Sequence, residues 1–454
     1  MLTVRGLIFC SWLAVTGCTG LSHISSEDPL FIGNEYKLEE GRNRAQKAIN
    51  QADIRLLPKP NNQFLWMRPA LARYHMLSDS GRQKKFWKGK ISEPVLFSQV
   101  SPTYNAKALQ NRIYHNGFFE NTVTFDTIRF GNKKAKYQYN ITLRQPYLIG
   151  NIQFPPPDTD LEGQIAQSEE QSLLKAGTLY SLETIQNERE RISNYLKLHG
   201  YLYFNPEFIY LRADSVSDDH KVNMEVKVKR STPKESRTAY SLNNIWVYDN
   251  YSLEDYRPDT LQLDHYYFLS QKRDLKYQAI KRGIFFEPGK KYSSSDHTET
   301  SRYLNSLAIV RSTTIKFTPS DSSNTIDAHL FLNKRKQYAY SAEFNTIFRS
   351  TNYFGPGIIF SFTNRNVKGS AEQLKVNLRG RFEMQIDDGK VNPAYELGLE
   401  VNYSVPRLRP SFLRNLGRRQ LPRTIISTGY NLFNRLDLYR LNSVFLDFGY
   451  RWSK

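Results

Sequence analysis

Cysteine is nearly absent from this sequence, which has only Cys10 and Cys18. Cys10 lies in a short apolar run, residues 6–15, that follows Arg5 and ends at small residues. Such a run is too short to cross a membrane and is typical of a secretory signal peptide, predicted here as residues 1–17. Because the leader is removed, the mature chain is expected to have no disulfide and no cysteine-based metal site.

Long hydrophobic runs are also absent, and hydrophobic residues make up 39% of the chain. No stretch of about 18 apolar residues occurs, which excludes a protein built from several membrane-spanning helices. The sequence has no His-Glu-x-x-His, no Gly-x-Ser-x-Gly and no phosphate-binding loop. Its 8 histidines are widely separated. We therefore predict that the chain is not an enzyme and needs no metal or other cofactor.

The formal charge of +19 is spread along the chain, with Asp and Glu interleaved among the basic residues. A nucleic-acid-binding protein usually gathers its basic residues on one element. The distribution therefore predicts no nucleic-acid partner, and it favours attraction to anionic membrane surfaces.

Alternating polarity dominates the sequence from Tyr338 onward. A strand places alternate side chains on opposite faces of its sheet. The pattern predicts six strands, at residues 338–348, 357–364, 372–385, 395–405, 424–431 and 443–453, with a hairpin turn at Asp387-Asp388-Gly389. Such strands are typical of an outer-membrane β-barrel. A soluble antiparallel sheet with one wet face gives the same alternation, so both alternatives stay open at this point.

Weak internal repetition precedes this region. Residues 147–154 align with residues 240–247, and Gly177-Thr-Leu-Tyr-Ser181 aligns with Gly289-Lys-Lys-Tyr-Ser293. Each copy predicts a strand, one or more helices and two further strands, which is a small α+β module. The expected strand pairs are 122–130 with 136–144, 203–211 with 222–228, and 311–317 with 325–333. The expected helices lie at 106–116, from Leu182 to His199-Gly200, and around 300–307.

Val15-Thr16-Gly17-Cys18 resembles a bacterial lipobox, in which the leader is cut before a cysteine that is then lipidated. Ordinary signal cleavage with an incidental cysteine is the alternative. Lipidation at Cys18 predicts a lipoprotein, and the polar residues 18–33 are expected to form its tether.

Helices that end in Gly117-Phe118-Phe119 or Gly200-Tyr201-Leu202, each followed by a hairpin and a Tyr-x-(Ile/Leu)-x-x-Ile strand, resemble POTRA domains. With the lipobox before them and alternating strands after them, they resemble the lipoprotein (TamL-type) branch of the BamA/TamA outer-membrane assembly family. The expected modules are residues 34–146, 147–236 and 237–336, followed by residues 337–454 as the first part of a transmembrane β-barrel.

The resemblance implies a factor that assembles outer-membrane proteins. Its periplasmic modules would capture unfolded clients by strand addition, and its first barrel strand would open sideways. The client-binding candidates are Tyr338, Tyr340, Ala342 and Phe344. The expected partners are unfolded outer-membrane proteins, outer-membrane lipid and an inner-membrane or periplasmic assembly protein. A two-partner-type secretion pore and a non-functional fragment are the alternatives.

Six strands are fewer than the eight or so of the smallest transmembrane barrels. The sequence therefore predicts a truncated product, with barrel completion by partner chains as the alternative. The link between the fourth and fifth strands, residues 406–423, is rich in arginine. It is interpreted either as a solvated loop at the membrane interface or as a contact for lipid phosphates or an assembly partner.

Overall fold

The computed structural model describes residues 21, 23–38, 49–50, 56–63, 68, 70–71, 74–75, 93–216, 219–249, 258–320, 324–348, 353–387, 390–410, 412, 418–436 and 438–452. The predicted signal peptide, Cys18 and the hairpin residues Asp388 and Gly389 lie outside them. The described residues form two compact units: the part up to residue 192 together with 206–229, and 193–205 together with the part from 230 onward.

Three small sheets build the modules. Their strand orders are β1-β3-β2, β4-β6-β5 and β10-β11-β7-β9-β8. In each sheet the first strand of the module pairs parallel with the last, and the last pairs antiparallel with the middle one. This topology confirms the predicted strand–helix–strand–strand order. The strands are β1 (Leu30–Leu38), β2 (Thr122–Phe130), β3 (Lys134–Thr142), β4 (Leu148–Gln153), β5 (Ile209–Val216), β6 (Lys221–Val228), β7 (Ser241–Asp249), β8 (Asp259–Leu263), β9 (Tyr266–Ser270), β10 (Val310–Pro319) and β11 (Thr325–Lys334).

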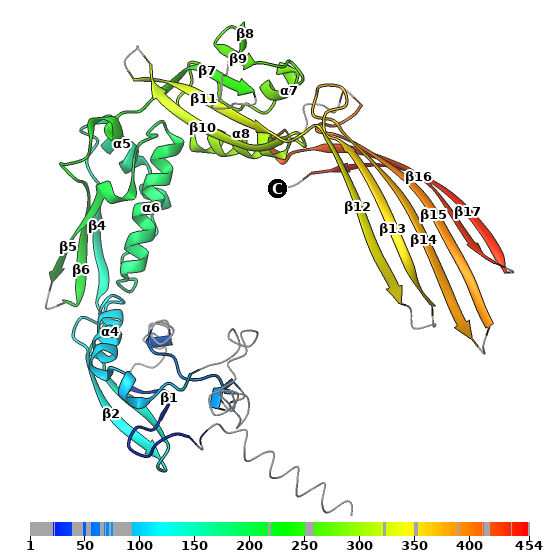
Figure 1. The fold of residues 1–454 in the computed structure, drawn as a ribbon. Coiled ribbons are helices and arrows are strands. Elements are labelled where there is room, and N and C mark those ends of the chain that lie inside the picture. Colours follow the sequence, from blue (N-terminus) through cyan, green and yellow to red (C-terminus); the bar gives the residue numbers. More distant parts are fainter. Residues whose placement is uncertain are drawn as a thin grey trace, which may run out of the picture. The chain divides into compact units, whose positions relative to one another are not determined.

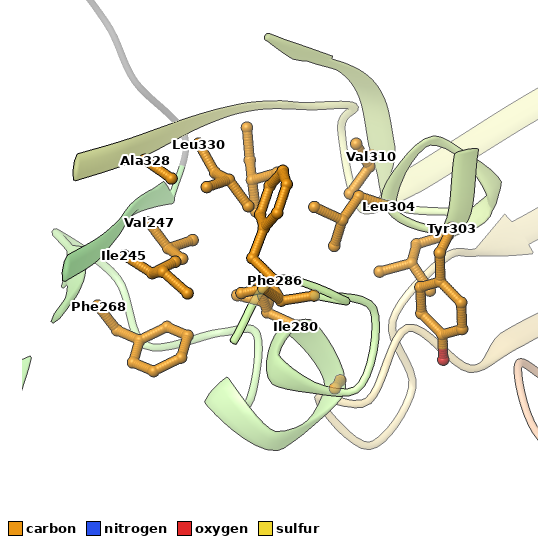
Figure 2. Packing of buried hydrophobic residues seen from close by; sticks show 14 of the residues in the cluster. Ile245, Val247, Phe268, Ile280, Phe286, Tyr303, Leu304, Val310, Ala328 and Leu330 are labelled. Carbon is orange, nitrogen blue, oxygen red and sulfur yellow. The ribbon is translucent and has the colours of Figure 1, made fainter. Parts of the chain in front are cut away.

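Helices bury the apolar face of each module. The described helices are α4 (Pro102–Tyr114), α5 (Asp160–Gln167), α6 (Leu182–Leu198), α7 (Tyr277–Lys281) and α8 (Ser294–Ser306). Leu109 and Ile113 of α4 are fully buried. In the third module, Phe286 lies between sheet residues such as Leu330 and Leu304 of α8 (Figure 2). None of the described helices combines the length and the apolar character needed to cross a membrane.

The predicted internal repeat appears in the backbone hydrogen bonds of the second and third modules. The N–H of Tyr147 donates to the carbonyl of Gly117 at 2.8 Å, and the N–H of Tyr240 donates to the carbonyl of Gly200 at 3.0 Å. The turn glycines match as well, since Gly177 donates to Ile149 and Gly289 donates to Leu242, both at 2.7 Å. Gly177 and Gly289 have φ of 80° and 81°, values that favour glycine. The two aligned segments therefore occupy equivalent positions.

Three expectations about the modules need correction. The predicted tether, residues 18–33, extends too far, because Leu30 and Phe31 are buried at the start of β1. The strand predicted at 203–211 begins only at Ile209, because Pro206 lacks the N–H that strand pairing requires and lies in a 3-10 helix, Pro206–Phe208. The β8–β9 hairpin of the third module was not predicted at all.

The C-terminal region forms one antiparallel sheet of six strands in sequence order, which Figure 1 shows lying side by side. This confirms the predicted antiparallel strands, and β12 matches its predicted bounds. The strands are β12 (Tyr338–Phe348), β13 (Tyr353–Asn364), β14 (Gln373–Asp387), β15 (Lys390–Val405), β16 (Arg423–Arg435) and β17 (Tyr439–Arg451). Asp387 pairs with Lys390, which flanks the predicted hairpin turn. Among the described strands, β12 and β17 form the two edges of the sheet and do not pair with each other.

The register places the apolar residues of all six strands on one face. A single row of paired residues crosses the sheet: Ala342, Phe360, Leu378, Leu399, Tyr430 and Val444. The neighbouring row on the opposite face contains Ser361, Asn377 and Glu400. The Ser361 hydroxyl donates to Asn377 Oδ1 at 2.9 Å, so this face is polar and cross-linked between strands. The predicted alternation is confirmed, and the apolar face remains exposed.

Candidate functional site: an unpaired strand beside a docked module

Among the strands that the structure describes, β12, the first of the large sheet, pairs only with β13, and its other side is open. The N–H of Arg365 donates to the carbonyl of Gln337 at 2.9 Å. Tyr338 is the next residue and faces Asn364, and the register then continues without a bulge. Because hydrogen-bonded and non-hydrogen-bonded pairs alternate in an antiparallel ladder, the N–H and C=O groups of residues 338, 340, 342 and 344 point to the open side.

These four positions are the predicted client-binding residues. Their side chains lie on the apolar face, and Tyr340 and Phe344 are each 79% exposed. The Tyr340 ring packs beside Phe362 of β13 with centroids 5.3 Å apart. The strand therefore offers free backbone groups and an apolar side-chain row together, which is the arrangement that accepts an added strand.

The small modules also have outer strands. The first members of the three predicted strand pairs, residues 122–130, 203–211 and 311–317, are the sequence's candidates for open sheet edges. They correspond to β2, β5 and β10, and each of these strands is outermost in its sheet. The opposite edges of the second and first sheets are partly covered. Ile149 of β4 exchanges backbone hydrogen bonds with Gly177 and Thr178, and the N–H of Phe31 of β1 donates to the carbonyl of Val95. The first and second modules thus each have one side better suited to strand addition.

The arginine-rich link before β16 docks on helix α8 of the third module. Tyr303 Oη donates to the carbonyl of Pro406 at 3.4 Å, and Arg302 donates to the carbonyl of Arg419. Arg419 pairs with Asp296 at 2.7 Å. Arg423 donates to the carbonyl of Ser306, an acceptor left free at the end of α8. Arg419 and Arg423 of this link therefore form contacts within the chain, whereas the sequence suggested a solvated loop or a contact with lipid phosphates or a partner.

A second loop of the sheet contacts a separate segment of the third module, just before helix α7. Asn366 Nδ2 donates to the carbonyl of Asp274 at 2.7 Å, and the N–H of Lys276 donates to the carbonyl of Gly369 at 2.7 Å. Ala371 is buried in the core of the module. Because two loops attach at separate points, the base of the large sheet is fixed to the third module.

A buried ion pair lies next to this contact. Lys334 Nζ is 3.0 Å from Asp249 Oδ1 and 2.5 Å from Asp274 Oδ1, and the Lys334 and Asp249 side chains are 8% and 3% exposed. Burial raises the pKa of Asp249 above its ordinary value, while the charge of Lys334 and the hydrogen bonds from Lys334 and Ser270 oppose that rise. The sequence pattern did not predict this ion pair. Its only signal was a charged residue at the end of each of two apolar strands.

The structure leaves several predictions without a test. Cys18 lies outside the described residues, so its lipidation stays a prediction. Within the described ranges, no group of three or more His, Cys, Asp or Glu side chains is arranged to hold a metal ion.

No protein-family profile matches the chain, and no curated protein matches it. Among solved structures, BamA from Haemophilus ducreyi lacking POTRA domains 1–3 is similar over 68% of this chain and 60% of that chain, with 13% identity and a TM-score of 0.37. POTRA3–5 of Haemophilus influenzae BamA is similar over 68% and 99%, with 10% identity and a TM-score of 0.33. CdiB from Acinetobacter baumannii is similar over 68% and 59%, with 10% identity and a TM-score of 0.29. This chain thus spans less than two thirds of the first of these proteins.

Proposed function

We propose that this protein inserts polypeptides into the outer membrane, with its small modules in the periplasm and its six-stranded sheet in the bilayer. The observation that carries the proposal is the apolar row that crosses all six strands and stays exposed: Leu378 is 53% exposed and Val444 is 77% exposed. A soluble sheet would cover such a face, since exposed apolar patches of this extent mark contacts with membranes or partners. Lipid provides that contact for strands of this pattern.

The proposed mechanism is strand addition. An extended client pairs first with an outer strand of a module, β2, β5 or β10, and then with the open side of β12. Backbone hydrogen bonds supply affinity without requiring one client sequence. The apolar residues Tyr338, Tyr340, Ala342 and Phe344 then place the apolar side chains of the client toward lipid. Client folding into the membrane supplies the free energy, so no nucleotide is required.

The N-terminal sequence adds two further proposals. Cleavage after residue 17 and lipidation of Cys18 would anchor the modules to a membrane from their other end. With this lipid anchor, we propose that the chain belongs to the TamL-type branch of the BamA/TamA family.

The direct test is to reconstitute the chain in phospholipid vesicles and measure how fast an unfolded outer-membrane protein becomes protease-resistant. Ala342→Pro removes one open-side N–H, and proline is tolerated at a sheet edge. Ala342→Ser retains that N–H and is the matched control. We expect faster client folding with the unaltered chain and with Ala342→Ser, and a loss of most of that acceleration with Ala342→Pro.

Depletion of the protein in cells is the second arm. A general assembly factor should lower the levels of many barrel proteins when depleted, and a dedicated secretion pore should affect the export of one partner. Unchanged barrel-protein levels, together with no acceleration in vesicles, would refute the proposed function.

A further inference from the structure

A recess of about 350 Å³ lies where helix α8 ends beside the base of the large sheet. Four of the residues that line it are cationic: Arg335, Arg365, Lys375 and Arg423. They come from four separate segments: the residue after β11, the residue after β13, and strands β14 and β16. We call this the cationic recess. Its volume is at the lower end of the range for ligand sites.

No acidic side chain lines the cationic recess. The nearby Glu372 pairs instead with Arg407, at 3.6 Å. Two of the cations are held in place through backbone carbonyls, since Arg365 Nη1 donates to Lys336 O at 2.9 Å and Arg423 donates to Ser306 O. These bonds orient the guanidinium groups without neutralising them. Like charges gathered in one recess favour an anionic ligand.

The position of the recess selects the kind of anion. Lys375 pairs with Thr363 of β13 and is three residues from Leu378 of the apolar row. Because this number is odd, Lys375 and Thr363 belong to the polar face. A phospholipid headgroup bound there would have its acyl chains on the wrong face of the sheet. An arginine fork also matches a carboxylate, which a polypeptide carries on Asp or Glu.

The open side of β12 is close enough to supply that polypeptide. Thr363 pairs with Ala339 of β12 and Lys375 is the next residue across, on β14, so a strand added to β12 would lie about three strand spacings, ~14 Å, from Lys375. A long Arg or Lys side chain of the recess and a Glu side chain of the added strand can together span that distance. An antiparallel client strand would bring its C-terminal half to this end, since β12 starts there at Tyr338.

We infer that the cationic recess binds acidic side chains of the polypeptide strand that pairs with β12. The inference rests on the proposed function and adds a client preference to it. Backbone pairing holds any extended segment, and the recess retains those with Asp or Glu near the end beside the third module.

The test uses the full chain in detergent micelles with a photo-crosslinking residue in place of Tyr340. The probes are two fluorescent strand peptides of alternating polarity with amidated C-termini, one with two Glu near its C-terminal end and the other with Gln at those positions. Fluorescence anisotropy measures affinity, and crosslinking reports contact with β12. We expect Arg335→Gln/Lys375→Gln to weaken binding of the Glu peptide about 10-fold, equivalent to about 1.4 kcal/mol, and to leave the Gln peptide unchanged.

The control variant is Lys175→Gln/Lys272→Gln, which removes the same charge from two exposed positions that do not line the recess. Equal binding of the Glu peptide to the recess variant and the unaltered chain, with crosslinking intact, overturns the inference and leaves the proposed function standing. Absence of crosslinking with either peptide instead counts against strand pairing at β12. Loss of binding to phosphatidylglycerol vesicles in the recess variant, with unchanged peptide affinity, assigns the recess to lipid phosphate and also overturns the inference.

Discussion

The third module and the six-stranded sheet have the same alternating sequence pattern but opposite surroundings. Leu330 of β11 is completely buried under helix α8 and Phe286 (Figure 2), whereas Leu446 of β17 is 74% exposed. Period-2 alternation determines which side chains share a face. It does not determine what covers that face. The comparison shows that a covering helix distinguishes the third module from the six-stranded sheet, whose apolar face stays exposed.

The largest expected effect is at the buried ion pair of the third module. Lys334→Met removes the lysine that pairs with the buried Asp249 carboxylate, and removal of one member of such a pair costs about 3–5 kcal/mol. Hydrogen exchange of the third module, which reports its local free energy of opening, measures the loss. Lys336→Met, at an exposed position, is the control. We expect Lys334→Met/Asp249→Leu to restore most of the free energy of opening. An unchanged free energy of opening in Lys334→Met would contradict a stabilising role for the ion pair.

The second prediction contrasts the two leucines directly. Leu330→Ala should cost about 2–5 kcal/mol, because it removes packed methyl groups and leaves a cavity. Leu446→Ala in detergent should change the free energy of unfolding by less than about 0.5 kcal/mol, as is usual for surface positions. Urea unfolding followed by hydrogen exchange in each region tests the pair. Equal losses at both positions would mean that the sheet is packed in the same way as the module.

The third prediction tests the lipid contact of the sheet. Leu378 and Asn377 are neighbours on opposite faces of β14. In vesicles, Leu378→Lys should destabilise the sheet by about 2–4 kcal/mol, because the proposed function places the apolar face against hydrocarbon, and Asn377→Lys should cost much less. Protease protection of the reconstituted chain as a function of urea concentration gives both values. A larger penalty for Asn377→Lys would reverse the assignment of faces.

The smallest effect concerns pH and the third module alone. Burial lowers the pKa of His297 and of His329 below their ordinary value. The folded state therefore disfavours protonation of both histidines. Their contribution to stability is complete above the pKa of unfolded histidine, about 6.5, and is lost as the pH falls from there toward the folded pKa values. His297→Gln/His329→Gln should flatten the fall in stability between about pH 7 and pH 5. An unchanged slope of stability against pH in this variant would show that other titrating groups cause the fall.

The sequence predicted most of the fold where local pattern and burial agree. Alternation located β12 at its observed bounds, and glycine at the end of α6 marked its stop, since Gly200 has φ of 109°. The β8–β9 hairpin escaped prediction because its strands have 5 residues each and only a weak alternating signal. The contacts of the arginine-rich link could not be predicted, because α8 and this link are more than 100 residues apart in the sequence. Only the folded chain brings Arg423 to the end of that helix.

The strand lengths carry one more consequence. Strands β16 and β17 each contain 13 residues. At about 3.3 Å per residue, each is roughly 43 Å long, which exceeds the ~30 Å hydrocarbon thickness of a bilayer. Strands of this length match that thickness when they are inclined by about 45°, the usual slope of barrel strands. An inclined first strand would present its hydrogen-bonding groups to a client obliquely, at different depths of the bilayer, so the client would begin pairing at the aqueous boundary and reach the interior last.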